Sequence, residues 1–108
     1  VVVTDYPDPE LIENLSWNIQ QQQLEGHVVA AGYRWGDSVE PLLALNGMCR
    51  FDRVLLCDLV FNHSEHAKLL RSLGELLIPD GLAYCVFTHY RPWLAEKDMD
   101  FLRLACEQ

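Results

Sequence analysis

The chain opens with a β-branched run that stops at an acidic residue and two prolines. Residues 1–4 are Val-Val-Val-Thr, Asp5 follows, and Pro7 and Pro9 precede an amphipathic stretch at residues 10–19. Valine-rich runs without polar alternation are typical of parallel strands that are buried on both faces. Ligands of open α/β sheets bind beyond the carboxyl ends of the strands, where Asp5 would lie. Asp5 could accept hydrogen bonds from both hydroxyls of a ribose, or it could simply cap the turn before Pro7.

The rest of the chain continues this alternation of strand and helix. The expected strands lie at residues 26–31, 51–57 and 82–88. The expected helices lie at residues 38–45, 64–77 and 93–108, with Ser64 as the N-cap of the second. The expected connections are a loop at residues 32–37 and a turn at residues 78–81. Alternating strands and helices predict an α/β fold with a parallel sheet and helices on its faces.

Charge and composition exclude several classes of protein. Half of the residues are hydrophobic, so we expect one globular domain rather than a disordered chain. Sixteen acidic residues against eight basic ones give a net charge of -8, which argues against nucleic-acid binding. No run approaches the roughly 20 apolar residues of a membrane span, and no signal peptide is evident. We expect a cytoplasmic monomer that binds neither nucleic acid nor membrane.

Cysteines and histidines give little sign of a metal or redox site. Four cysteines are present without a C-x-x-C pair, and we expect Cys57 and Cys85, which lie in apolar runs, to be reduced core thiols. His63 and His66 are three residues apart and could share a metal on a helix. Without a further set of ligands, solvated histidines at a helix start are the favoured interpretation, and we expect no metal.

Two loops at the carboxyl ends of strands carry the more specific residues. Asp58 follows the third expected strand directly, and Phe61 comes three residues later. Trp35 lies between two glycines in the loop after the second strand, where its indole could lie against an adenine. Taken singly, Trp35 could be a core residue and Phe61 a hydrophobic staple of the next helix. Together with Asp5 they place acidic and aromatic groups on one rim of the predicted sheet.

Four strings of residues carry a resemblance to a known family. They are residues 5–9 (DYPDP), 33–36 (YRWG), 58–66 (DLVFNHSEH) and 87–92 (FTHYRP). In this order they resemble the seven-β-strand S-adenosylmethionine-dependent methyltransferases, within the nicotinamide N-methyltransferase-like branch of lysine methyltransferases. The last two strings resemble a fungal group of these enzymes that methylates the N-terminal glycine and adjacent lysine of translation elongation factor 1-alpha.

The resemblance assigns a role to five residues. It implies that Asp5 holds the ribose of S-adenosylmethionine, that Trp35 lies beside the adenine, and that Cys57 also touches the cofactor. It implies that Asp58 and Phe61 begin and end a (D/E)-x-x-(Y/F) motif where the substrate amine meets the methyl group. A sulfonium methyl group is already activated, so such an enzyme must mainly align a neutral amine with it. Acidic and aromatic groups could attract and orient that amine.

The resemblance also implies a Rossmann-like, seven-stranded fold that is truncated at both ends. Residues 1–108 would be the central part of one methyltransferase domain, from the second strand of the family to the helix after its fifth. The glycine-rich loop for the cofactor would precede residue 1, and no G-x-G occurs here. The family's first strand would pair with residues 1–4 and with residues 54–57. Without it, we expect either two separate strand pairs or a collapsed sheet.

Two other functions stay open at this point. The chain could come from a non-catalytic α/β interaction module or from a degenerate methyltransferase that serves as a protein-binding scaffold. A nucleotide-sugar or dinucleotide enzyme is a weaker alternative, because a proline-rich segment follows Asp5 and the pair of Asp58 and Phe61 has no role there.

Overall fold

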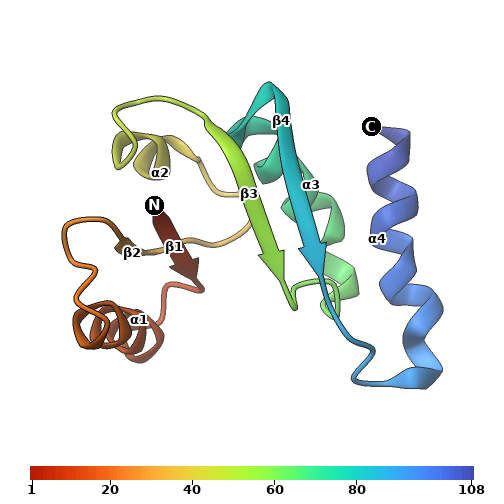
Figure 1. Cartoon of the computed structure of the whole chain (residues 1–108). Helices are drawn as coiled ribbons and strands as arrows, with labels where there is room; N and C mark the ends of the chain where they lie inside the picture. Colours follow the sequence, from red (N-terminus) through yellow and green to blue (C-terminus); the bar gives the residue numbers. More distant parts are fainter. The chain divides into compact units, whose positions relative to one another are not determined.

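The computed structural model describes all 108 residues, which form two compact units, Val1–Arg50 and Phe51–Gln108 (Figure 1). The first unit contains β1 (Val2–Asp5), α1 (Pro9–Gln21), β2 (Val29–Gly32) and α2 (Glu40–Ala44). The second contains β3 (Phe51–Cys57), the 3₁₀ turn η1 (His63–Glu65), α3 (His66–Leu76), β4 (Leu77–Val86), η2 (Pro92–Leu94) and α4 (Ala95–Glu107). The predicted alternation of strand and helix is confirmed. None of the helices has the length and apolar character that crossing a membrane requires.

The four strands form two separate parallel sheets of two strands each. β1 pairs with β2, so that Asp5 lies opposite Gly32. β3 pairs with β4, so that Leu56 lies opposite Cys85 and Cys57 opposite Val86. Both pairs are parallel, as predicted, and no ladder of hydrogen bonds joins one pair to the other. Two separate strand pairs are one of the two arrangements that the sequence analysis expects.

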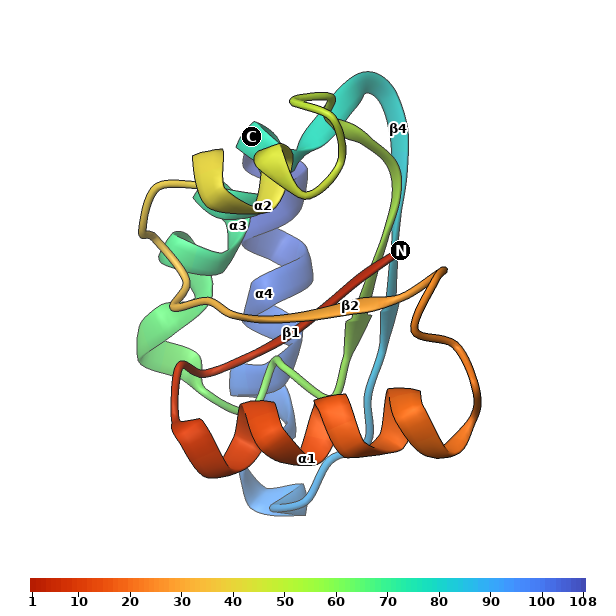
Figure 2. The same ribbon diagram turned by 90° about the vertical axis from the view of Figure 1, so that its left-hand side faces the viewer.

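In the first unit, α1 lies along the β1–β2 pair (Figure 2). The helix starts where the sequence puts a good cap, because the Asp8 side chain accepts a hydrogen bond from the Glu10 amide at 3.0 Å. Pro9 occupies the first turn, where a missing amide hydrogen costs nothing. The turn between β1 and α1 brings Pro7 against Gly32: a Cβ atom at residue 32 would lie 2.9 Å from the Cα and Cβ atoms of Pro7. Glycine is therefore required at the end of β2.

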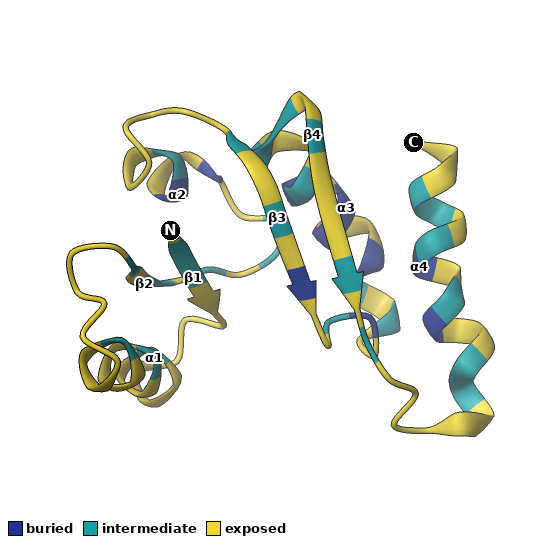
Figure 3. Ribbon diagram, viewed as in Figure 1, coloured by how far each residue is buried: buried dark blue, intermediate teal, exposed yellow.

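The second unit has its core between the β3–β4 pair and the two long helices. α3 packs against β4, and α4 packs beside α3 (Figures 1 and 2). The buried apolar residues of this unit are Leu56, Val60, Leu69, Leu70 and Phe101 (Figure 3). They come from the strand pair, from the two helices and from the loop after β3, so that loop is part of the core.

The other face of the β3–β4 pair is exposed, which departs from the expectation of strands buried on both faces. Leu55, Tyr84 and Val86 are 69%, 49% and 67% exposed (Figure 3). Side chains alternate between the faces of a strand, so these residues point away from α3 while Leu56 points toward it. Both faces of the strand pair carry apolar residues, as the sequence indicates, but only one face is covered.

Two local predictions were wrong. Ser64 does not cap the helix: a 3₁₀ turn precedes α3, and the Ser64 hydroxyl donates to the side-chain oxygen of Asn62 at 3.4 Å. Residues 78–81 do not form a turn before the strand. They lie inside β4 as a bulge: Leu77 pairs with Phe51, and Leu82 pairs with Arg53. The fourth strand therefore begins five residues earlier than predicted.

The contact of Pro7 with Gly32 predicts a large effect of one methyl group. Gly32→Ala should lower the free energy of unfolding by about 1–3 kcal/mol, because the new Cβ would overlap backbone and ring atoms that cannot move freely. Urea denaturation measures the effect. Gly26→Ala is the matched control, since no atom lies within 4 Å of a Cβ at that position. Equal stabilities of the two variants would contradict this account of Gly32.

Candidate functional site

Asp5 lies at the carboxyl end of β1, as predicted. Its side chain is exposed, and its Oδ1 atom accepts a hydrogen bond from the Tyr6 amide at 2.7 Å. The Asp5 carbonyl accepts from the Tyr33 amide at 2.8 Å, which ties the end of β1 to the loop after β2. Asp5 therefore does help to form the turn before Pro7. Because its carboxylate remains exposed beside a glycine with no side chain, a hydroxylated ligand can also reach it.

Trp35 is held in a loop that is stabilised by its own hydrogen bonds. The Tyr33 hydroxyl donates to the Asp37 carbonyl at 2.8 Å, and Arg34 forms an exposed ion pair with Asp37 at 3.2 Å. Gly36 has a φ of +90°, a conformation that glycine adopts without strain. Trp35 itself is half-buried, so it is not a fully buried core residue. The loop fixes the indole and leaves part of its surface accessible.

Asp58 comes directly after Cys57, the last residue of β3, and is held in a left-handed backbone conformation. Its φ is +55°, which aspartate tolerates better than most residues. Its amide donates to the Val86 carbonyl at 2.8 Å, and its Oδ1 atom accepts from the Thr88 amide at 3.3 Å. The first bond ties the loop after β3 (residues 58–62, the β3 loop) to the end of β4, and the second ties it to the loop after β4 (residues 87–91, the β4 loop).

Cys57 is exposed, so the prediction that it is a core thiol was wrong. It shares the uncovered face of β3 with Leu55, as strand alternation requires. Cys85 is half-buried, and burial raises the pKa of its thiol, which keeps it protonated. All four cysteines are free.

Phe61 lies in the β3 loop and is 46% exposed. Its ring packs edge-on against Tyr90 of the β4 loop, with the ring centres 6.2 Å apart. The Arg91 guanidinium donates to the Phe61 carbonyl at 3.1 Å. The aromatic partner of Phe61 is thus in the neighbouring loop and not in α3, which favours a place on the rim over a helix staple.

Asp98 of α4 connects the same two loops, and it was not among the residues predicted from the sequence. This buried residue of α4 accepts hydrogen bonds from two histidines: His63 Nε2 lies 2.5 Å from its Oδ1 atom, and His89 Nδ1 lies 2.7 Å from its Oδ2 atom. The hydrogen bond from His63 and then that from His89 hold the pKa of the Asp98 carboxyl below its usual value. The string at residues 87–92 contributes to the family resemblance only, and the sequence pattern of α4 does not indicate a buried acid.

The two histidines of η1 and α3 are not solvated, contrary to the sequence-based interpretation. His66 is 5% exposed, and its Nε2 atom donates to the Val60 carbonyl at 2.7 Å. Its ring packs edge-on against His63 and Phe101. No group of three or more His, Cys, Asp or Glu side chains is arranged to hold a metal ion. Through the bonds of His66 to Val60 and of His63 to Asp98, these histidines attach the β3 loop to the core.

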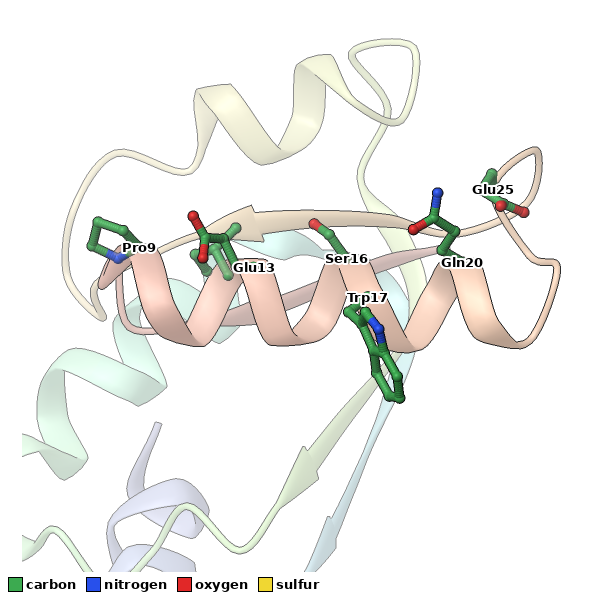
Figure 4. Close-up of a pocket in the computed structure, with 7 residues that line it drawn as sticks. Pro9, Glu13, Ser16, Trp17, Gln20 and Glu25 are labelled. Carbon is green, nitrogen blue, oxygen red and sulfur yellow. The ribbon is translucent and has the colours of Figure 1, made fainter.

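The predicted residues therefore fall into two groups. The Val1–Arg50 unit holds Asp5 and Trp35, and the Phe51–Gln108 unit brings Cys57, Asp58 and Phe61 together at one strand end. A shallow hollow elsewhere on the first unit contains none of these residues. It runs along α1 and is lined by Pro9, Ile12, Glu13, Ser16, Trp17, Gln20 and Glu25 (Figure 4).

Comparison with known proteins points to one family. The family model described as "Lysine methyltransferase" matches residues 1–108. A relative from Eremothecium gossypii, named protein N-terminal and lysine N-methyltransferase EFM7, is 46% identical over 99% of this chain. Relatives of the same name from Schizosaccharomyces pombe and Neurospora crassa are 44% and 41% identical over 97% and 100% of the chain. The chain covers only 44%, 44% and 43% of these three proteins, less than half of their length.

The lowered pKa of Asp98 predicts an acid-dependent loss of stability. A carboxyl with a lowered folded pKa stabilises the fold fully above its ordinary value of about 3.9, and loses that contribution as the pH falls through the folded value. The free energy of unfolding should therefore fall less between pH 5 and about pH 2.5 in Asp98→Asn than in the wild type. Urea denaturation at the two pH values measures this. Asp100→Asn, an exposed acid of the same helix, should behave like the wild type.

Proposed function

Because the chain belongs to the lysine methyltransferase family, we propose that the protein transfers a methyl group from S-adenosylmethionine to an amine of a protein substrate. The acceptor in this proposal is the N-terminal amine, a lysine, or both, as the names of the relatives suggest. Residues 1–108 would form the central part of one Rossmann-like, seven-stranded domain. The matched relatives are more than twice as long as this chain, so the activity is proposed for the whole protein.

One observation carries the proposal: both strand pairs end in an exposed acid beside an aromatic residue. Asp58 directly follows β3, with Phe61 three residues later, in the (D/E)-x-x-(Y/F) pattern of the resembled family. The Thr88 amide of the β4 loop holds the Asp58 carboxylate in place, and the exposed Phe61 ring lies in the β3 loop together with Asp58. An acid and an aromatic face in this arrangement attract a cationic or neutral amine and orient it. Alignment of that amine is the main task in methyl transfer.

The cofactor-facing roles in this proposal are those that the family resemblance implies. When bound, S-adenosylmethionine supplies the activated methyl group. The exposed carboxylate of Asp5 would accept hydrogen bonds from the ribose hydroxyls, and the accessible surface of Trp35 would lie against the adenine. Cys57, exposed at the end of β3, would also contact the cofactor. The exposed carboxylate of Asp5 and the partly exposed indole of Trp35 support these proposed roles.

For the substrate, we propose translation elongation factor 1-alpha. The support is the resemblance of the strings at residues 58–66 and 87–92 to the group of enzymes that methylates this protein. The net charge of -8 favours association with a basic protein partner. We also propose that the protein is a cytoplasmic monomer that binds neither nucleic acid nor membrane.

The role of Asp5 predicts a loss of cofactor affinity. In the full-length protein, Asp5→Ala should weaken S-adenosylmethionine binding by about 1.5–3 kcal/mol, the range for hydrogen bonds to a charged group. Isothermal titration calorimetry measures this. Glu25→Ala, which removes an exposed acid from the same unit, should bind as the wild type does. Unchanged affinity of Asp5→Ala would leave Asp5 with its role in the turn alone.

The role of Asp58 predicts a loss of turnover without a loss of cofactor binding. Asp58→Asn keeps an acceptor for the Thr88 amide and tolerates the left-handed backbone, so it removes mainly the charge. Methyl transfer to a peptide from the N-terminus of elongation factor 1-alpha, followed by mass spectrometry, should slow by about 10- to 150-fold. S-adenosylmethionine affinity should stay within about twofold of the wild type.

Asp52→Asn is the control for this experiment, because it neutralises an exposed acid within the same strand, away from the loop. Transfer by Asp58→Asn at the rate of this control would reduce Asp58 to a structural residue. Absence of transfer by the wild type to any N-terminal or lysine amine would favour a protein-binding scaffold.

A further inference from the structure

We infer that Asp98 is a positioning residue for methyl transfer, because its carboxylate bridges His63 and His89 and so holds the β3 and β4 loops in one arrangement. This inference rests on the proposed function, since the two loops carry Asp58 and Phe61. Asp98 touches neither the acceptor nor the cofactor in this proposal. It acts through the histidines.

The geometry of the bridge uses both oxygens of one carboxylate. His63 lies at the end of the β3 loop and bonds to Oδ1, and His89 lies within the β4 loop and bonds to Oδ2. The Asp98 side chain is only 5% exposed, and that of His63 is 22% exposed. Hydrogen bonds to a charged group that water scarcely reaches are stronger than exposed ones. A carboxylate on a 13-residue helix therefore sets the separation of two loops that lack regular structure of their own.

The other contacts between the two loops are weaker and lie at the surface. They are the 3.3 Å bond from the Thr88 amide to Asp58, the 3.1 Å bond from Arg91 to the Phe61 carbonyl, and the edge contact of Phe61 with Tyr90. All of these groups are exposed, so water competes for each hydrogen bond. The buried bridge is the contact that can keep them aligned, because it fixes the backbone on both sides.

The hydrogen bonds also define which ring nitrogens carry protons. A carboxylate only accepts, so His63 must donate from Nε2 and His89 from Nδ1. Both rings can do so whether neutral or protonated. The groups that face the bridge are these two rings and His66, whose own Nε2 donates to the Val60 carbonyl. Asp100 and Arg103 of α4 pair with each other at 2.6 Å on the exposed side of the helix.

The first experiment compares Asp98→Ala with Asp100→Ala in the full-length protein, at a temperature where both are folded. Asp98→Ala should lower kcat for peptide methylation by on the order of 10- to 100-fold, the effect of a small misplacement of catalytic groups. Its affinity for S-adenosylmethionine should equal that of the wild type. Hydrogen exchange should accelerate in residues 58–63 and 87–91 and not elsewhere. Asp100→Ala should change none of these quantities.

Partial rescue by Asp98→Asn gives a readout that a merely structural role would not move. The amide oxygen of asparagine can accept a hydrogen bond from one of the two histidines, whereas alanine accepts none. The kcat of Asp98→Asn should therefore lie between that of Asp98→Ala and that of the wild type, while the affinity of all three proteins for S-adenosylmethionine stays equal.

The results distinguish a positioning role of Asp98 from a purely structural one. Equal kcat values for Asp98→Ala and Asp100→Ala, or a parallel loss of cofactor affinity in Asp98→Ala, would overturn the inference. If Asp98→Ala does not fold, His89→Ala breaks one side of the bridge at a more exposed residue and should show the same split between kcat and cofactor affinity. If the wild type methylates no amine, the proposed function fails. The exchange rates of the two loops then still test the bridge, and unchanged rates in Asp98→Ala would refute it.

Discussion

The parallel pairing of β3 with β4 is the constraint on which the acceptor side of the candidate site depends. Parallel strands end at the same edge, so their following loops must emerge side by side. The register places Cys57 opposite Val86, and the Asp58 amide continues the ladder by donating to the Val86 carbonyl. A shift of one residue would turn Leu56 out of the core and move the Asp58 carboxylate away from Thr88. Core packing and loop geometry therefore fix the register together.

The parts of this arrangement that depend on local pattern could be predicted from the sequence. An apolar run at residues 51–57 predicts a strand because few other structures bury such a short run, and the observed bounds of β3 are identical. Asp58 at the strand end follows from the same run. Pro7 and Pro9, followed by the amphipathic stretch from residue 10, predict the start of α1 nearly to the residue. In each case, neighbours within a few positions supply the deciding interaction.

The parts that depend on partners far along the chain could not be predicted in this way. Asp98 is separated from His63 by 35 residues, and α4 carries acidic residues on several faces, so a buried acid among them looks like any solvated one. One signal was available: Asp98 lies three residues before the buried Phe101 and so shares its face of the helix. Ser64 failed as a cap for a related reason. His66 is drawn into the core by Phe101 and the Val60 carbonyl, which moves the start of the α-helix past the serine.

The two groups of predicted site residues are organised by separate sets of contacts, and this makes their roles separable. The end of β1 and the Trp35 loop are held by hydrogen bonds among residues 5–37, with Gly32 and Gly36 as the positions where a side chain would interfere. The β3 and β4 loops are held by α3 and α4 through His66, His63, His89 and Asp98. The contacts of the bridge all lie within the second unit. Disturbing the bridge should therefore alter the alignment of an acceptor amine.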